Sequence, residues 1–293
     1  MKVLVTGKNG QLGWELAQCM PDNMQLFALD SSELDISDEA GVDNTIARIK
    51  PDLVINTAAY TAVDKAEQEQ EKAYAVNALG PQYVAQACLT HQARLLHIST
   101  DFIFDGSKTT PYQTDDEANP LGIYGASKWA GEVAVRAILP EALIVRTAWV
   151  YSSHGHNFVK TMLRLMGEKP QLGIVYDQIG TPCWAAGLAK WLWAVAHKPA
   201  VSGTFHWTDA GIASWYDFAV AIQELAMEKG MLHTAIEIRP IPATAYPTPA
   251  RRPSLSVLDK TSAEQAGDIV TRHWRAQLSD MLDRLNKQPG LIG

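Results

Sequence analysis

Along the chain, short apolar runs alternate with longer stretches in which apolar and polar positions mix at helical spacing. Five of the runs have the length of buried strands: 3–5, 25–29, 53–55, 94–98 and 142–146. The intervening helical stretches include 34–49, 71–91 and 124–138. Strands that alternate with helices in this way predict a parallel sheet with right-handed crossovers. The expected fold class is therefore α/β, with a doubly wound parallel sheet.

The first apolar run leads directly into a glycine-rich turn. Gly7, Gly10 and Gly13 stand three residues apart, and helical spacing continues from Trp14. One glycine permits the tight turn, one lets backbone approach a pyrophosphate, and one lets the helix pack on the strand. The N–H groups and dipole at the helix start favour phosphate. A plain glycine-bearing turn would fit the triplet alone, but the preceding strand favours a Rossmann-like dinucleotide-binding fold.

Beyond residue 150 the sequence pattern changes to helical stretches separated by short apolar segments and turns. We expect residues 1–150 to form the dinucleotide-binding domain, with later segments returning to it. Residues 151–293 are expected to form mainly a smaller α/β domain that binds the substrate. A proline-rich segment at 239–253 is incompatible with a helix or a central strand. Its Arg251-Arg252 pair either faces a diphosphate or is solvated on a connector, and the residues alone favour neither.

Predicted cofactor contacts follow the carboxyl edge of the sheet, where ligands bind in open α/β folds. Asp30 closes the second strand, 23 positions after Gly7, at the usual place of the acid that bonds the adenosine ribose. Such a carboxylate favours NADH over NADPH, because it repels the 2′-phosphate of NADPH, although the neighbouring Lys8 could offset that repulsion. The plainer alternative is that Asp30 is a solvated residue at the end of a strand. The predicted contacts are Gly7, Asn9, Gly10, Gln11, Leu12, Gly13, Asp30, Asp35, Ile36, Ala58, Ala59, Tyr60, Tyr124 and Lys128.

Composition narrows the classes of partner. The formal net charge is −7 without a basic run, which argues against nucleic acid as the main partner. No apolar run approaches the ~20 residues of a spanning helix, so we expect no membrane partner and a cytoplasmic location. The three scattered cysteines suit a reducing compartment.

The sharpest chemical pattern is Tyr124 with Lys128, four residues apart and so on one face of a predicted helix. A nearby ammonium favours the phenolate and is expected to lower the tyrosine pKa towards the working pH. Thr100, at the end of the fourth strand, offers a hydroxyl to the same substrate oxygen. A Tyr-x-x-x-Lys pair alone often lies on a solvent face, but the glycine turn and Thr100 make a coincidence improbable.

These motifs together resemble the extended short-chain dehydrogenase/reductase family. The resemblance rests on residues 7–13, Ser-Thr-Asp at 99–101 and Tyr-Gly-Ala-Ser-Lys at 124–128. Longer blocks narrow it to the members that act on a dTDP-linked 4-keto-6-deoxyhexose: 56–67, 99–106, 146–151, 157–162 and 245–253.

The resemblance implies reduction of the C4 keto group of dTDP-4-dehydro-L-rhamnose by NADPH or NADH. Tyr124 would protonate the nascent alkoxide, Lys128 would hold the nicotinamide ribose, and Thr100 would polarise the carbonyl. Asp101 and Trp149 would shape the hexose pocket. The weaker candidates for the nucleotide diphosphate are Asn157 and Arg252.

Some family members dimerise around magnesium held by glutamates, and a homodimer is compatible with the resemblance. Glu15 matches one such glutamate, but Cys-Trp-Ala-Ala-Gly after Pro182 and the terminal Gly-Leu-Ile-Gly supply no second or third acid. We therefore predict no metal site and expect Glu15 to be a first-turn helix acid.

Two other functions stay open at this point. One is a sister reductase that acts on a different 4-keto hexose or gives another product configuration. The other is a non-catalytic cofactor-binding subunit that regulates a partner enzyme.

Overall fold

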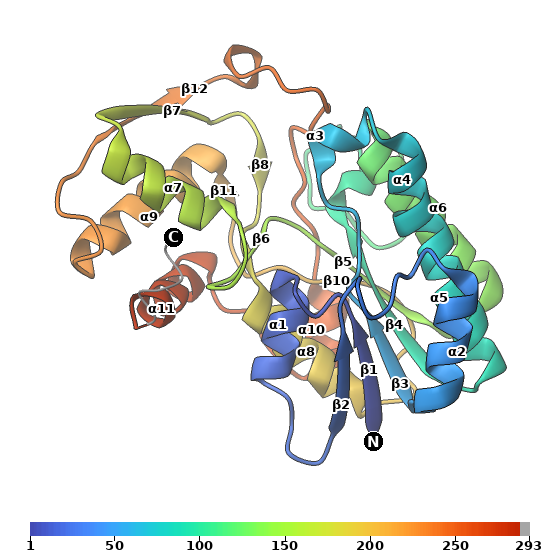
Figure 1. Ribbon diagram of the computed structural model, residues 1–293. Helices are drawn as coiled ribbons and strands as arrows, with labels where there is room; N and C mark the ends of the chain where they lie inside the picture. The colour runs from blue at the N-terminus through green and yellow to red at the C-terminus, as the bar shows by residue number, and fades with distance from the viewer. Residues whose placement is uncertain (288–293) are drawn as a thin grey trace.

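A six-stranded parallel sheet organises the computed structural model, which describes residues 1–287 (Figure 1). Its strand order is β10-β5-β4-β3-β1-β2, and every neighbouring pair is parallel. The order reverses between β1 and β3, which makes the carboxyl ends of these strands the expected ligand site. The strands are β1 (Lys2–Thr6), β2 (Gln25–Leu29), β3 (Leu53–Asn56), β4 (Arg94–Thr100), β5 (Leu143–Thr147) and β10 (Gly203–His206).

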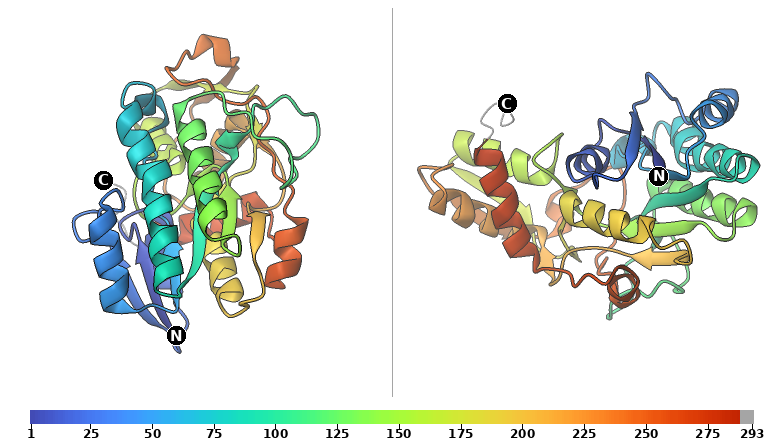
Figure 2. Two further views of the ribbon diagram at one scale, coloured as in Figure 1. Left: turned by 90° about the vertical axis from the view of Figure 1, so that its right-hand side faces the viewer. Right: turned by 90° about the horizontal axis from the view of Figure 1, so that it is seen from below.

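Helices cover both faces of this sheet, which confirms the doubly wound α/β prediction. On β1, Leu4 points to one apolar cluster and Val3 and Val5 to the other, as strand alternation requires. The face seen in Figure 2, left, carries α2, α5 and α6, and the opposite face carries α1, α8 and α10. Their bounds are α1 (Gln11–Gln18), α2 (Glu39–Ile49), α5 (Gly80–Thr90), α6 (Ile123–Ile138), α8 (Ala185–Ala196) and α10 (Thr261–Gly267).

The stretch expected to be one helix at 71–91 is interrupted. It consists of α4 (Gln70–Tyr74), a π-helical turn η1 (Ala75–Leu79) and α5. Asn77 in this turn accepts a hydrogen bond from Tyr60 N at 2.8 Å and donates to Tyr60 O at 3.0 Å. The inserted residue thus turns a buried amide towards the chain after β3, as π-turns often do at functional sites. The stretch 34–49 has the expected order, a turn at 36–37 followed by α2 from Glu39 to Ile49.

A second apolar cluster fills the smaller lobe at the left of Figure 1. Its centre is formed by α7, α9 and α11, beside short strand pairs. The proline-rich segment begins within β12, which pairs with β7 in a two-stranded sheet and so is no central strand; it contains no α-helix, but residues 243–245 form a short 3-10 turn. The remaining elements are α3 (Val63–Ala66), η2 (Asp101–Ile103), β6 (Val150–Tyr151), α7 (Phe158–Glu168), β7 (Gln171–Val175), β8 (Ile179–Gly180), β9 (Cys183–Trp184), β11 (Ala213–Ser214), α9 (Trp215–Glu228), β12 (Glu237–Ile241), η3 (Ala243–Ala245) and α11 (Trp274–Asn286).

Candidate active site

The glycine turn after β1 is built by contacts between backbone atoms. Gly7 has a φ of +74°, and a Cβ there would lie 2.9 Å from Ala58 N. A Cβ on Gly13 would lie 2.3 Å from Gly7 O, so α1 can approach the turn only without a side chain at this position. The first N–H groups of α1 are thereby held at the carboxyl edge of the sheet, where they can receive a phosphate.

A cavity of about 780 Å³ runs along this edge, within the size range of cofactor sites. It passes the ends of β1, β2, β3 and β4 and reaches α6. The predicted site residues that line it are Gly7, Asn9, Gly10, Gln11, Leu12, Asp30, Asp35, Ile36, Ala58, Ala59, Thr100, Asp101, Tyr124, Lys128 and Trp149. Residues of the glycine turn near the start of the chain and residues of the Tyr124–Lys128 pair thus line one continuous cavity.

At one end of the cavity, Asp30 is held by short-range hydrogen bonds. Its carboxylate accepts from Ser32 Oγ at 2.6 Å, Ser32 N at 2.9 Å and Asn9 Nδ2 at 2.9 Å. These bonds, led by those from Ser32, lower the Asp30 pKa to about 2, so the group is ionised at neutral pH. Lys8 Nζ lies 3.5 Å from Asp30 Oδ2 and also pairs with Glu33. A negative and a positive group therefore stand together where the adenosine ribose is expected.

At the other end lie Thr100, Tyr124 and Lys128. The N-terminus of α6 is capped by Glu67, which accepts from Ile123 N at 2.8 Å. A Cβ on Gly125 would lie 2.1 Å from Phe102 O, so this glycine lets α6 pack against η2 and brings Tyr124 to the end of β4. Lys128 is buried and its Nζ donates to Ile98 O at 2.7 Å.

The pKa of Tyr124 moves opposite to the sequence-based expectation. Burial raises it to about 12, and hydrogen bonding with the Thr100 hydroxyl offsets only part of the rise. The Lys128 ammonium is directed to the Ile98 carbonyl, and burial lowers its own pKa to about 8. Tyr124 is therefore a neutral phenol at physiological pH, which suits a proton donor.

Asp101 is a buried carboxyl on the cavity wall. Its Oδ1 accepts from Thr100 Oγ1 at 3.0 Å, while Oδ2 has no hydrogen-bond partner within the described residues. Burial raises the Asp101 pKa to about 6. A buried carboxylate oxygen without a hydrogen-bond partner, on a residue that lines the cavity, is a candidate acceptor for a ligand hydroxyl.

Trp149 forms an aromatic wall of the cavity in a left-handed backbone conformation, with φ of +46°. Its ring stacks on Trp215 of α9, with the centroids 3.5 Å apart. A Cβ on Gly180 would lie 2.7 Å from the Trp149 ring, so β8 passes flat against it. Trp215 is a neighbour that the sequence analysis did not single out.

Four predicted contact residues do not line the cavity: Gly13, Tyr60, Asn157 and Arg252. Asn157 caps α7, accepting from Lys160 N at 3.1 Å, and donates to Gln11 Oε1 at 3.0 Å. Arg252 pairs with both carboxylate oxygens of Asp64, at 3.1 and 2.8 Å. In this structure both polar groups are engaged within the protein, and their contact with a diphosphate stays a prediction.

Glu15 differs from the expected first-turn helix acid. It lies in the second turn of α1 and is only 1% exposed. Its carboxylate accepts from Ser152 Oγ at 2.7 Å, Trp184 Nε1 at 3.3 Å and Arg284 at 2.7 Å. A buried carboxylate needs such partners, and these come from segments far along the chain. Glu15 therefore joins α1 to the smaller lobe.

Some cavity residues were missed by the sequence analysis. Thr57, Ser99 and Thr147 stand at the ends of parallel strands, a position that the strand pattern could have indicated. Gly155 and His156 come from the connection between β6 and α7, for which local sequence offers no comparable signal. Within residues 1–287, no group of three or more His, Cys, Asp or Glu side chains could hold a metal ion. The terminal residues 290–293 lie outside the described part.

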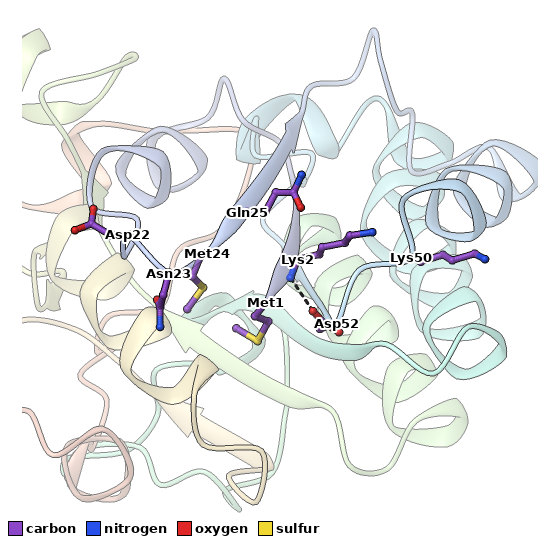
Figure 3. A pocket seen from close by; sticks show the side chains of 8 residues that line it. All are labelled: Met1, Lys2, Asp22, Asn23, Met24, Gln25, Lys50 and Asp52. Carbon is purple, nitrogen blue, oxygen red and sulfur yellow. Dashed lines mark hydrogen bonds between the residues drawn. The ribbon is translucent and has the colours of Figure 1, made fainter.

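A second hollow lies at the opposite, amino ends of the strands, beside Met1, Met24 and Lys50 (Figure 3). Its one internal polar contact in Figure 3 is the donation from Lys2 N to Asp52 Oδ2 at 2.7 Å. It is remote from the glycine turn and from Tyr124. Among the helices of residues 1–287, none is long and apolar enough to cross a membrane.

Comparisons with known proteins agree with this architecture. A family model described as "RmlD substrate binding domain" matches residues 1–287. The chain is 42% identical to the dTDP-4-dehydrorhamnose reductase of Aggregatibacter actinomycetemcomitans, over 96% of this chain and 98% of the relative. It is 38% identical to the enzyme of that name from Salmonella typhimurium, over 97% and 98% of the two chains.

Solved structures give the same result. A dTDP-4-dehydrorhamnose reductase from Clostridium acetobutylicum superposes with a TM-score of 0.92 and 41% identity, covering 98% of this chain and 100% of that one. The Bacillus anthracis reductase in complex with NADP superposes with a TM-score of 0.91 and 34% identity, covering 97% and 99%. With 38–42% identity to curated reductases over nearly its whole length, the chain belongs to the RmlD family of extended short-chain dehydrogenases/reductases.

Proposed function

We propose that this protein reduces the C4 keto group of dTDP-4-dehydro-L-rhamnose to give dTDP-L-rhamnose, with NADPH or NADH as reductant. The observation that carries the proposal is that Thr100, Tyr124 and Lys128 meet on the same cavity as the glycine turn. The names of the similar reductases, one of them bound to NADP, support the substrate and the cofactor class.

The cavity fits a dinucleotide, because the start of α1 lines it with Gly10, Gln11 and Leu12, and the first N–H groups of a helix have no acceptor within the helix. When bound, the reduced nicotinamide supplies a hydride to C4. The first turn of α1 would hold the pyrophosphate, and Asp30 with Asn9 would bind the adenosine ribose. Lys128 would hold the nicotinamide ribose.

Tyr124 gives its phenolic proton to the alkoxide that forms at O4, because an alkoxide is a stronger base than a phenolate. Thr100, whose hydroxyl donates to Asp101 Oδ1 in this structure, would turn its proton to the same oxygen and stabilise the developing charge. Asp101 and Trp149 position the hexose, the first by its unpartnered Oδ2 and the second by the part of its ring that lines the cavity. Asn157 and Arg252 remain candidates for the diphosphate of the nucleotide sugar, for which each would have to exchange its present partner.

We also propose a division of labour between two domains. Residues 1–150, joined by β10 at the sheet edge, bind the cofactor, and residues 151–293 mainly bind the nucleotide sugar. The tie between Glu15 and Arg284 would hold α1 against the second domain.

The test is oxidation of NADPH, and separately of NADH, followed with and without dTDP-4-dehydro-L-rhamnose. The proposal requires oxidation only when the keto sugar is present, and dTDP-L-rhamnose as the product by NMR. A product of different configuration would assign the protein to a sister reductase. Cofactor binding without turnover on this or related keto sugars would instead point to a regulatory subunit.

A further inference from the structure

The connection between β6 and α7 forms a strap across the start of α1. We define the strap as residues 152–157, Ser-Ser-His-Gly-His-Asn. Ser152 Oγ donates to Glu15 at one end, and Asn157 Nδ2 donates to Gln11 Oε1 at the other. Gly155, with φ of +72°, passes so close that a Cβ would lie 3.3 Å from Gln11 Cγ. Both ends and the middle of the strap are therefore fixed to the helix that follows the glycine turn.

His154 fixes the strap at a further point. Its Nε2 contacts the Asn9 carbonyl at 3.1 Å, inside the glycine turn itself. Its ring stacks on Trp14 with the centroids 5.2 Å apart, and the Arg284 guanidinium covers Trp14 at 4.9 Å. Since a hydrogen bond and stacking both hold His154, its imidazole is occupied in maintaining the strap.

Two strap side chains make none of these contacts: Ser153, which is buried, and His156. His156 is exposed and lines the cavity together with Gly10 and Gln11. No hydrogen bond or ion pair within the described residues engages its imidazole. The contacts on either side of His156 nevertheless fix its backbone, so the orientation of its side chain towards the cavity carries little ordering cost.

The side chains that line the cavity include few basic groups, which makes the position of His156 important for binding an anion. Of the described residues that line the cavity, two have basic side chains, Lys128 and His156. Lys128 is buried at the tyrosine end, while the acids Asp30 and Asp35 lie on the adenosine side. A diphosphate in this cavity therefore meets one side chain near α1 that can donate a charged hydrogen bond.

We infer that His156 is a diphosphate-binding residue, held in place by the strap. The inference rests on the proposed function, because it assumes that the cavity takes a dinucleotide and a nucleotide sugar. The diphosphate is either that of the cofactor at the start of α1 or that of the nucleotide sugar entering from the smaller lobe. The imidazole adds a hydrogen-bond donor to the N–H groups of the helix.

The experiment is a binding titration without turnover, with NADPH in one arm and dTDP in the other. His156→Ala is expected to weaken binding of one ligand about three- to tenfold, the typical range for one exposed hydrogen bond to a charged group. His156→Lys should bind that ligand at least about half as tightly as the parent protein, since it keeps a hydrogen-bond donor, and His156→Glu should bind it more weakly than His156→Ala. The affected arm identifies which diphosphate is bound.

The matched control is His233→Ala, which removes another exposed imidazole in the smaller lobe and should leave both affinities unchanged. Equal losses for the Lys, Ala and Glu variants, or no loss in either arm, would overturn the inference. Charge-ordered binding in a protein that turns over no keto sugar would retain the inference and refute the proposed function. A parent protein that binds neither ligand would refute both.

Discussion

The two ends of the cavity are constructed by different physical means. At the glycine turn, the position of every group follows from close approaches of backbone atoms, as at Gly7 and Gly13. At the tyrosine end, the function depends on side chains whose pKa values are shifted by desolvation, that of half-buried Tyr124 to about 12 and that of buried Lys128 to about 8. The first end should therefore respond to added volume and the second to a change of proton or charge. This difference makes binding and proton transfer separable by mutation.

The largest effect is expected from Tyr124→Phe, which removes the proton donor but keeps the ring against Phe102. We expect kcat to fall at least ~10²-fold, while the NADPH affinity changes by less than about twofold. Steady-state kinetics and fluorescence titration measure the two quantities. The control is Tyr176→Phe at an exposed position, which should change neither. Near-normal turnover by the Tyr124 variant would remove this residue from its proposed role.

Gly13→Ala probes the opposite end. The new Cβ would meet Gly7 O at 2.3 Å and push α1 away from the turn. We expect about 1–3 kcal/mol lower stability and roughly tenfold weaker NADPH binding, from overpacking and displaced N–H groups.

The matched control for that variant is Gly167→Ala in α7, where nothing lies within 4 Å of the new Cβ. It should be as stable as the parent or gain about 0.5–1 kcal/mol, because alanine is the better helix former. Urea unfolding compares the two variants. Equal stabilities would contradict the backbone-contact account of the turn.

The pH dependence of turnover should come from the tyrosine end alone. Burial lowers the Lys128 pKa to about 8, so its ammonium is present below that pH and is lost as the pH rises through it. If the ammonium is required, kcat/KM falls about tenfold per pH unit above that value, while NADPH binding through the turn falls much less. A pH–rate profile that stays flat to about pH 9.5 would show that the Lys128 charge is not needed.

The last prediction concerns the pH dependence of stability at Asp101, where no effect on turnover is needed for the test. Its folded-state pKa of about 6 lies above the ordinary 3.8, so keeping the buried group ionised costs stability above that pKa, and the cost vanishes when both states are protonated. The variant Asp101→Asn cannot ionise at this position. Its free energy of unfolding, relative to that of the parent, should therefore rise by about 1–3 kcal/mol when the pH is raised from 4 to 7.5. Urea unfolding at both pH values measures the difference. A difference that is independent of pH would place the Asp101 pKa near its ordinary value.

The same contrast explains which features could be predicted from the sequence. The strands, the doubly wound sheet and the glycine turn depend on local spacing, and the structure has them close to their predicted limits. The direction of the Tyr124 pKa depends on burial and on the orientation of Lys128, which the four-residue spacing does not specify. The partners of Glu15 come from Ser152, Trp184 and Arg284, and only the folded chain brings them together.

Substrate contacts are the least predictable part. The resemblance points to Asn157 and Arg252 by position, but each has an alternative partner inside the protein, a helix end and Asp64 respectively. The strap that carries His156 has no repeating pattern, and its place over α1 results from side-chain contacts between distant segments. The partners of such polar groups are set by tertiary contacts. The spacing of residues along the sequence therefore does not show whether a group binds the ligand or another part of the protein.

The most direct test of this account is a crystal structure of the protein with NADP⁺. The account predicts the pyrophosphate at the first turn of α1, between Gly10 and Gly13, and the nicotinamide ring beside Tyr124 with Lys128 bonded to its ribose. A cofactor bound in the reverse direction, or with its nicotinamide remote from the Tyr124 hydroxyl, would contradict the central claim.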